Sequence, residues 1–559
     1  MNVKKSSYWQ RRLLLVVAGA FAAWPDSTAL GVSFRTVAMS GESAPGAGGA
    51  TFTEFMIPGA AHSHLVINNS GDVGFYARVA GSGVTNATQS GVWSEAAGNL
   101  RLVAREGSHA PGTPSGVNFS FGSPFTFEPE PVFSATGLAA FDGGLTGSGV
   151  STANTGIWSE GGGALHLVAR KGSPAPGTAS GVTFNLLADP KVDANGRATF
   201  LATVAGSGVS GLNERGIWTE RSGATQLLVR GGDPAPGAPV GVRFGSYLEW
   251  DLNSAGRIAL RGGLTGPGID FFSGEGVWVE GAGGLDLVTR AGQAAPGTEP
   301  GVNFFGFLNP TLSDAGHVVF RAGLTGAGVS SDNQDGIWAK VDQEVELVAR
   351  DGSVAPGTVG DVRFTHFTSP IINNAGQIAF RALLGGGDVD SSNNMGLWMA
   401  SGGETKLLLQ KGAPAPGAGP GVTFNFLGDP ELNSTGQVAF HGMLQGPGVD
   451  STNNFGIWAV GAHGLELVAR TGQLFEVAPG DQRTIESLLF GTNAVQSFRG
   501  MGFNDLGQLA FFAKFTDGSK GIFVADVGTI PEPHSIGLLA IGLAMAWNYR
   551  RNTPARRHD

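Results

Sequence analysis

The chain has no cysteine among its 559 residues. Disulfide bonds, thiolate chemistry and zinc sites built from cysteine are therefore excluded. Charged residues are also scarce, at 14%, and acidic residues outnumber basic ones, which gives a formal net charge of −10. An acidic chain of this kind is a poor candidate for binding nucleic acid through its phosphates.

Glycine, in contrast, is abundant, with 92 residues, and much of it recurs at a fixed period. An element of the form Asn-x-x-Gly-x-x-Ala-Phe occurs eight times, with drift, at a spacing close to 60 residues. Its glycines are Gly71, Gly137, Gly196, Gly256, Gly316, Gly376, Gly436 and Gly507. An Ala-Pro-Gly triplet and a Gly-apolar-Trp triplet keep step with it, with Phe523 replacing the eighth tryptophan. A period of this length indicates one large repeat array.

Each repeat predicts four short strands, which we name A to D. In one copy, residues 421–433 indicate an extended approach followed by a short strand A, residues 433–436 a tight turn and residues 437–440 strand B. Residues 456–460 and 465–470 follow as strands C and D. Such a sheet has two apolar faces and buries them only against like neighbours, in a stack or in a ring. The tryptophan of strand C is expected in this core.

The two ends of the array favour the ring. Residues 34–41 align with strand D, whereas residues 521–526 align with strand C, so the chain starts with the strand that its last repeat lacks. A closed β-propeller uses this offset, because its first strand completes its last sheet. The sequence therefore predicts an all-β, eight-bladed β-propeller of about 60-residue, four-stranded repeats over residues 30–528, closed by pairing of its N- and C-terminal strands.

Residues 1–29 indicate a secretory signal peptide. Four basic residues precede an apolar run from Leu13 to Ala23, and small residues that suit cleavage follow. The alternative is a membrane anchor, but a run of this length is short for crossing a bilayer.

Residues 529–559 have three parts in order. Pro531-Glu532-Pro533 precedes an apolar segment, residues 536–547, and the chain ends in a basic tail with Arg550, Arg551, Arg556 and Arg557. This arrangement resembles the PEP-CTERM sorting signal of Gram-negative bacteria. The resemblance implies transient anchoring in the inner membrane, with the arginines inside, cleavage by an exosortase, and release to the cell surface or the extracellular space. A permanent C-terminal anchor is the alternative.

The array itself resembles two families. Its Pro-x-x-Asn-x-x-Gly-x-x-Ala-Phe spacing is similar to the blade motif of TolB-type propellers, and residues 34–527 resemble the tandem NxxGxxAF-repeat, choice-of-anchor surface proteins of bacteria. Departures from the motif are Ser134, Asp193 and Ser313 for the asparagine and Leu260 for the phenylalanine. The resemblance implies the fold and the cellular address, and no enzymatic activity.

Candidate metal ligands lie just before the position that proline usually occupies in strand A. Glu130, Asp189, Glu249 and Asp429 are expected near one mouth of a central channel, where carboxylates suit calcium; the alternative is solvated strand ends. His62-Ser-His64 and the Asn-rich B–C loops at 387–394 and 448–454 are better explained as a surface strand and Asx turns. No catalytic or cofactor-binding residue is assigned.

Arginines that recur at the end of strand D predict a structural partner, either a carbonyl group or a glutamate of strand C. They are Arg105, Arg170, Arg230, Arg290, Arg350 and Arg470, and the glutamates are Glu95, Glu160, Glu220 and Glu280. Function is expected instead where extra residues interrupt the period, at 119–133 and 474–502. Neither stretch contains a Gly-x-Ser-x-Gly or His-Glu-x-x-His motif.

The leading hypothesis is an exported, exosortase-processed surface or matrix propeller with a non-enzymatic interaction or structural role. Its expected partners are the export machinery, the exosortase, and extracellular polysaccharide or other surface proteins. One alternative is a secreted carbohydrate-active hydrolase or lyase that uses paired carboxylates. A calcium-dependent glycan-binding module is the other.

Overall fold

The computed structural model describes residues 32–55, 65–96, 98–121, 131–150, 154–461, 463–490 and 502–529. The chain divides into two units, Met1–Gly31 and Val32–Asp559, and the fold below is that of the second. The predicted signal peptide, the Pro-Glu-Pro motif and the basic tail lie outside the described residues. Within them, no helix is long and apolar enough to cross a membrane.

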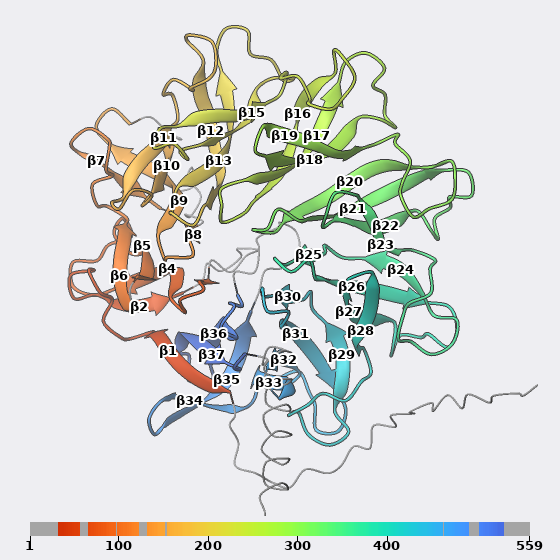
Figure 1. Ribbon diagram of the computed structural model, residues 1–559. Helices are drawn as coiled ribbons and strands as arrows, with labels where there is room; N and C mark the ends of the chain where they lie inside the picture. Colours follow the sequence, from red (N-terminus) through yellow and green to blue (C-terminus); the bar gives the residue numbers. More distant parts are fainter. Residues whose placement is uncertain are drawn as a thin grey trace, which may run out of the picture. The chain divides into compact units, whose positions relative to one another are not determined.

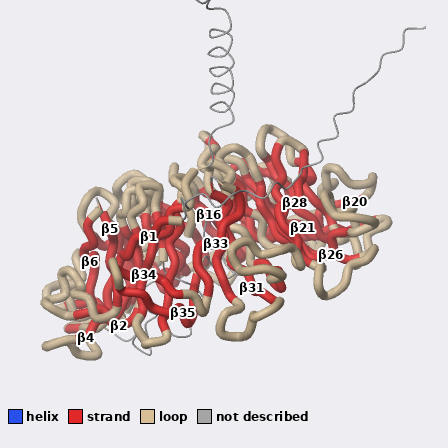
Figure 2. Tube along the Cα trace, turned by 90° about the horizontal axis from the view of Figure 1, so that it is seen from below, coloured by secondary structure: helices blue, strands red, loops and turns tan. Residues whose placement is uncertain are grey.

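The described residues form β-strands arranged in eight antiparallel sheets, which follow one another round a ring (Figures 1 and 2). Blade 1 contains β2 (Thr51–Glu54), β3 (Val66–Ile67), β4 (Val73–Ala80), β5 (Ser90–Ala96) and β6 (Asn99–Arg105). Blade 2 contains β7 (Val117–Ser120), β8 (Val132–Phe133), β9 (Ala139–Gly147), β10 (Thr155–Ser159) and β11 (His166–Arg170). Blade 3 contains β12 (Thr183–Val192), β13 (Ala198–Ala205), β14 (Arg215–Thr219) and β15 (Gln226–Arg230). Blade 4 contains β16 (Arg243–Leu252), β17 (Ile258–Thr265), β18 (Glu275–Gly281) and β19 (Gly284–Arg290).

The second half of the chain repeats this order. Blade 5 contains β20 (Val302–Leu312), β21 (Val318–Gly326), β22 (Asp335–Lys340) and β23 (Glu346–Arg350). Blade 6 contains β24 (Arg363–Phe367), β25 (Ile371–Ile372), β26 (Ile378–Gly385), β27 (Met395–Ser401) and β28 (Glu404–Gln410). Blade 7 contains β29 (Thr423–Leu427), β30 (Glu431–Leu432), β31 (Val438–Gln445), β32 (Phe455–Gly461) and β33 (Gly464–Arg470). Blade 8 contains β34 (Leu474–Ala478), β35 (Asp481–Leu489), β36 (Gln508–Phe515), β37 (Lys520–Asp526) and β1 (Ser33–Met39).

Ring closure occurs as the sequence predicts. Strand β1 pairs antiparallel with β37, from Ser33 opposite Asp526 to Met39 opposite Gly521. The first strand of the chain is therefore strand D of the last blade. The prediction of an eight-bladed β-propeller is confirmed. Strand A is continuous in blades 3 to 5 and is split into two short strands in blades 1, 2, 6 and 7.

Two of the repeated triplets form one latch. The indole Nε1 of Trp458, on strand C of blade 7, donates to the carbonyl oxygen of Pro416 in the preceding Ala-Pro-Gly loop at 3.1 Å. A Cβ on Gly456 would lie 2.7 Å from the ring of Trp458, so only glycine fits two residues before the tryptophan. The same indole–proline bond recurs at Trp93, Trp158, Trp218, Trp278, Trp338 and Trp398. All seven side chains are fully buried, so their predicted place in the core is confirmed.

The third repeated element is the A–B turn. The Oδ1 of Asn433 accepts the backbone N–H groups of Thr435 and Gln437 at 3.1 and 2.8 Å, and Gly436 adopts a φ of 86°. The Nδ2 of the same asparagine donates to the carbonyl oxygen of Asn504 in the next blade at 2.9 Å. The turn thus closes one blade internally and joins it to its neighbour, which explains both the asparagine and the glycine.

Blade 8 departs from the pattern. Its Ala-Pro-Gly, residues 478–480, turns the β34–β35 hairpin and does not latch an indole. Phe523 occupies the tryptophan position of this blade, and its side chain has no N–H group that could donate to a proline carbonyl. The ring of Phe475 packs edge-on against Phe523 with a centroid distance of 4.8 Å. The eighth triplet keeps the sequence period, but it has a different structural role.

Candidate functional site

The predicted channel-mouth carboxylates that the structure describes each have their own charged partner or surroundings and do not form a shared site. Glu130 lies outside the described residues. Glu249 accepts from Arg261 at 3.0 Å, and Asp429 accepts from Arg381 at 2.7 Å. Burial raises the pKa of Asp189, an effect that the nearby Lys191 opposes. Across the described ranges, no group of three or more His, Asp or Glu side chains is placed to hold a metal ion. A calcium site stays a prediction.

The Asn-rich B–C loops contain Asx turns, as their sequence indicates. Asp390 Oδ1 accepts the N–H of Ser392 at 2.7 Å, and Asn393 Oδ1 accepts the N–H of Asp390 at 2.8 Å. Hydrogen bonds from the Ser392 side chain and backbone lower the pKa of Asp390. The carboxylate therefore serves the turn itself. His62 and His64 lie outside the described residues.

Four of the recurrent arginines at the end of strand D donate from Nε to a backbone carbonyl oxygen of the B–C loop, one of the two predicted partners; they are Arg105, Arg230, Arg350 and Arg470. Arg170 donates instead to the side-chain Oδ1 of Asn154. The Nε of Arg470 donates to the carbonyl oxygen of Asn453 in the B–C loop of its own blade at 2.7 Å. Its Nη1 donates to the carbonyl oxygen of Ala418 at 2.8 Å. These arginines fix the loops to the blade and have a structural role.

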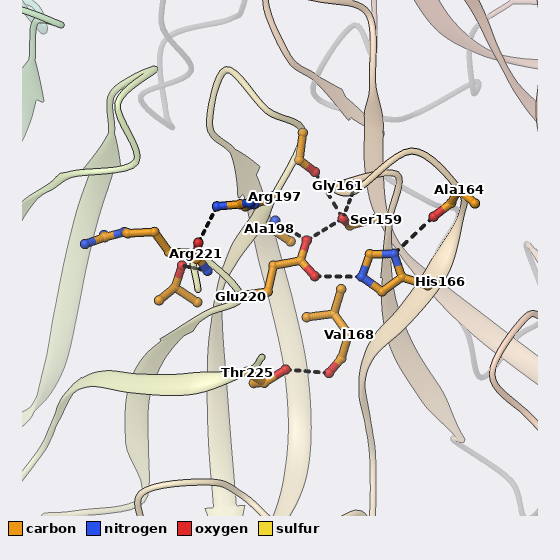
Figure 3. A network of polar contacts seen from close by, with 12 residues as sticks. Ser159, Gly161, Ala164, His166, Val168, Arg197, Ala198, Glu220, Arg221 and Thr225 are labelled. Carbon is orange, nitrogen blue, oxygen red and sulfur yellow. Dashed lines mark hydrogen bonds and ion pairs between the residues drawn. The ribbon is translucent and has the colours of Figure 1, made fainter. Parts of the chain in front are cut away.

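The glutamates of strand C have other partners, and Glu220 forms the fullest network (Figure 3). Its Oε1 accepts from the backbone N–H of Ala198 at 2.6 Å and from the hydroxyl of Ser159. Its Oε2 lies 2.8 Å from Nε2 of His166, whose Nδ1 lies 3.1 Å from the carbonyl oxygen of Ala164. Serine and histidine both bind the carboxylate rather than each other. A nucleophilic serine needs the imidazole as its base, so this trio is not a catalytic triad.

Among the described residues, the network is one of four clamps in which a blade holds the glutamate at or just after strand C of the next blade. Ser159 and His166 belong to blade 2, and Glu220 follows strand C of blade 3. At the places equivalent to His166 in strand D, Arg35 binds Glu95 and Arg101 binds Glu160, with closest N–O distances of 2.6 and 2.7 Å. In blade 3 the partner comes instead from the C–D turn, where Arg221 binds Glu280 at 2.6 Å. The first of these pairs joins blade 8 to blade 1. The recurrence indicates that these groups hold the ring together.

A small polar cavity of about 140 Å³ lies among the A–B turns. Its lining includes Asn69, Asp314, Asn374, Ser434 and Asp505. The Nδ2 of Asn69 donates to Asp505 at 2.7 Å, and its Oδ1 accepts from the N–H of Asp505 at 3.0 Å. These polar groups therefore already serve contacts between blades.

A larger cavity of about 450 Å³ lies between blades 4 and 5, and we name it the blade 4–5 pocket. It is lined by Arg261, Asp270, Phe271, Gly274, Glu275, Phe305, Gly306, Phe307, Leu308 and Gly323. Phe271 is 79% exposed, and its ring centroid lies 5.3 Å from that of Phe305. Phe272, which is 54% exposed, packs against both rings. Aromatic side chains so exposed are uncommon on a surface that has no partner.

The polar side of the blade 4–5 pocket is an ordered charge network. Arg261 donates to Glu275 at 2.9 Å and to Glu249 at 3.0 Å, and its guanidinium lies 4.8 Å from the ring of Tyr247. Glu275 also accepts the backbone N–H of Phe307 at 3.1 Å. Burial alone would lower the pKa of Arg261, but its bonds to Glu275 and Glu249 raise it above the ordinary value. The guanidinium is therefore a fixed cation with carboxylates on both sides.

Sequence analysis missed this pocket, because it expected function where extra residues interrupt the period. The signal was instead a change of residue type in a loop of constant length. Residues 270–274 read Asp-Phe-Phe-Ser-Gly, whereas the equivalent loops 390–394 and 450–454 read Asp-Ser-Ser-Asn-Asn and Asp-Ser-Thr-Asn-Asn.

A family model matches residues 22–127 and 67–537, which together span most of the chain. The chain belongs to the Family of unknown function (DUF7453). Its two matches overlap, as expected for a repeat array. No curated protein matches the chain.

Solved structures with related architecture share little sequence with the chain. The β-propeller domain of the Trilobed protease from Pyrococcus furiosus is 9% identical, with a TM-score of 0.37, over 76% of this chain and 99% of that domain. An acylaminoacyl peptidase from Pyrococcus horikoshii is 10% identical, with a TM-score of 0.34, over 81% of this chain. The chain spans only 57% of that peptidase. The polysaccharide lyase Uly1 is 10% identical, with a TM-score of 0.34, over 73% of this chain and 91% of the lyase.

Proposed function

We propose that the chain is an exported protein of the cell surface or extracellular matrix that acts by binding, without catalysis. The observation that carries this proposal is the blade 4–5 pocket. Side chains that recur in blade after blade latch indoles, clamp neighbours or fix turns, so their conservation within the array is structural. The side chains of Phe271 and Phe272 have none of these three roles, and they leave apolar surface exposed to water, which is unfavourable for the isolated protein. A binding role explains why this exposed apolar surface is present.

Export rests on the two ends of the chain. Residues 1–29 have the features of a signal peptide, and residues 529–559 resemble a PEP-CTERM tail with its motif at Pro531-Glu532-Pro533. In this proposal the tail holds the propeller at the inner membrane until an exosortase cleaves it. The ring is complete at β37, which ends at Asp526, so removal of the tail leaves every blade intact.

The test uses three versions of the chain in a bacterium that has an exosortase. The wild type is compared with a chain that stops before Pro531 and with a Pro531→Ala, Pro533→Ala variant. We expect the wild type to be cleaved and to reach the surface or medium. The truncated chain should keep the same melting temperature and be released unsorted, whereas the double variant should stay uncleaved in the membrane fraction. Retention of the truncated chain in the membrane fraction would refute the sorting role.

A further inference from the structure

The blade 4–5 pocket exists because side chains are missing from it. Gly306 of β20 lies directly opposite Gly323 of β21, and both line the cavity. The equivalent cross-strand pairs in blades 3, 6 and 7 carry side chains: Leu186 with Thr203, His366 with Leu383, and Phe426 with Met443. At positions that are filled in these three blades, blade 5 is therefore open.

The opening is not forced by the backbone. A Cβ on Gly306 would come no closer than 3.5 Å to another group, and one on Gly323 no closer than 3.6 Å, which are ordinary contact distances. Neither glycine has a positive φ. Two positions with room for a Cβ thus hold glycine where the cavity lies.

The adjoining loop changes in the same place. Gly274 lines the pocket at the loop position where blades 5, 6 and 7 have Gln334, Asn394 and Asn454. Phe271 and Phe272 replace the pair Ser331 and Asp332 of blade 5. The loop keeps its fold, since Asp270 Oδ1 accepts the N–H of Phe272 at 2.9 Å and the hydroxyl of Ser273 at 2.8 Å. Residues that open the cavity and residues that give it an aromatic wall occur together, between the same two blades.

The chemistry of the lining limits the class of ligand that the pocket can bind. One wall is aromatic, with the rings of Phe271 and Phe305. The charged residues of the lining are Asp270, Glu275 and Arg261. Aromatic faces carry negative charge density and attract weakly positive C–H groups, while the polar side offers both acceptors and donors. A volume of about 450 Å³ lies within the range of ligand pockets.

We propose that the blade 4–5 pocket binds a neutral saccharide, whose C–H face stacks on Phe271 and Phe305 and whose hydroxyls bond to Glu275 and Arg261. This assignment rests on the proposed binding role and names its ligand class. A sugar ring is the ligand that has an apolar face and hydroxyls that both donate and accept.

Charge and desolvation disfavour the other ligand classes. An anionic ligand would meet Asp270 and Glu275, which outnumber the one cation of the lining, Arg261. Arg261 is also paired with Glu249. An organic cation would lie against the guanidinium of Arg261 itself. An apolar side chain of a partner protein would strip water from the carboxylates and return no hydrogen bond, which is costly. A neutral hydroxyl-rich ligand avoids all three penalties.

The test measures binding of the full-length protein, in mild detergent, to soluble neutral glucan, mannan, xylan and galactan and to their hexasaccharides by titration calorimetry. The first variant is Phe271→Ser, Phe272→Asp, which installs the residues of blade 5. The second is Gly306→Leu, Gly323→Thr, which installs the side chains of blade 3 and fills the cavity. Leu212→Asp is the matched control, because Leu212 is a 61% exposed apolar residue at the equivalent loop position of blade 3.

We expect saturable binding of at least one neutral probe by the wild type and by the Leu212→Asp control. Affinity should fall at least tenfold in the phenylalanine variant and be lost in the filled variant, with the melting temperature of each maintained. The assignment is overturned if no neutral probe binds, if the filled variant binds like the wild type, or if tetramethylammonium binds in preference to every sugar. Sorting by the tail is measured in a separate experiment. If no saccharide binds, the export proposal is therefore unaffected, and if sorting fails, the saccharide assignment is unaffected.

Discussion

Asn504, in the last blade, donates from Nδ2 to the backbone carbonyl oxygen of Asn68, in the first blade, at 2.9 Å. The two residues are 436 positions apart in the sequence. This bond is the same turn-to-turn contact that Asn433 makes with Asn504, so the ring of turns continues across the point where the chain begins and ends. Together with the pairing of β1 and β37, it seals the propeller.

The first prediction concerns this seal. Asn504→Ala removes the donor to Asn68 and the acceptor for the N–H groups of Leu506 and Gln508, and leaves buried polar groups unpaired. We expect the free energy of unfolding to fall by about 1–3 kcal/mol. Denaturant unfolding measures the change. Asn195→Ala, an exposed residue of the equivalent turn in blade 3, is the control and should change stability by less than about 0.5 kcal/mol. Equal effects of the two substitutions would contradict the role of the seal.

The second prediction concerns the indole latch. Trp458→Phe keeps most of the ring but removes the N–H that binds Pro416, and should lower stability by about 1–3 kcal/mol. Trp458→Ala should cost about 3–5 kcal/mol, since it also leaves a cavity. Thermal or denaturant unfolding separates the two. If Trp458→Phe were as stable as the wild type, the hydrogen bond would have no part in the latch.

The third prediction concerns blade 8, where a ring contact takes the place of the indole latch: Phe475 of the β34–β35 hairpin packs against Phe523. Phe475→Ala removes a buried ring and should destabilise the protein by about 3–5 kcal/mol. The control Leu474→Ala changes the neighbouring residue, which is 67% exposed, and should have little effect. The prediction fails if both substitutions leave the unfolding midpoint unchanged.

The sequence predicted the fold well because the period reports which positions recur. Residues 433–436 form the predicted turn, and β32 and β33 cover the predicted strands C and D. The period does not report which atoms meet. That Trp458 binds Pro416, some 42 residues earlier, depends on how strand C lies against the loop before strand A.

The site was harder to predict for a related reason. A search for extra residues points to insertions, whereas the blade 4–5 pocket comes from substitutions at constant spacing. Gly306 and Gly323 are 17 residues apart, and only the register of β20 against β21 makes them face each other. A comparison of each blade with its neighbours, position by position, would have found Phe271 and Phe272.

The interblade clamps give a fourth prediction. Glu220→Ala removes the acceptor for Ala198, Ser159 and His166 and should lower stability by about 1–3 kcal/mol. His166→Arg, in contrast, should preserve stability, because Arg101 at the equivalent place binds both oxygens of Glu160 at 2.7 and 2.8 Å. Denaturant unfolding compares the two variants. Loss of stability in His166→Arg as large as in Glu220→Ala would contradict the equivalence of the clamps.

The last prediction concerns pH. Burial raises the pKa of Glu106 from 4.5 to about 7, against the opposing hydrogen bond from Phe121 N–H. Burial and the nearby carboxylate of Asp335 raise the pKa of Asp351 from 3.8 to about 7, against the pull of Arg321. In both cases the folded state binds protons more tightly than the unfolded chain. Their contribution to stability is therefore complete below the unfolded pKa and is lost as the pH rises through about 7.

Glu106→Gln with Asp351→Asn should remove this dependence, because an amide keeps the shape of the protonated acid without ionising. We expect the double variant to gain melting temperature relative to the wild type as the pH rises from 5 to 8, with most of the gain between pH 5 and 7. Asp390→Asn, a fully exposed carboxylate whose pKa is lowered, is the control and should not gain in this interval. A constant difference between the double variant and the wild type over that range would show that neither carboxyl titrates with folding, since only a group with different pKa values in the two states makes stability depend on pH.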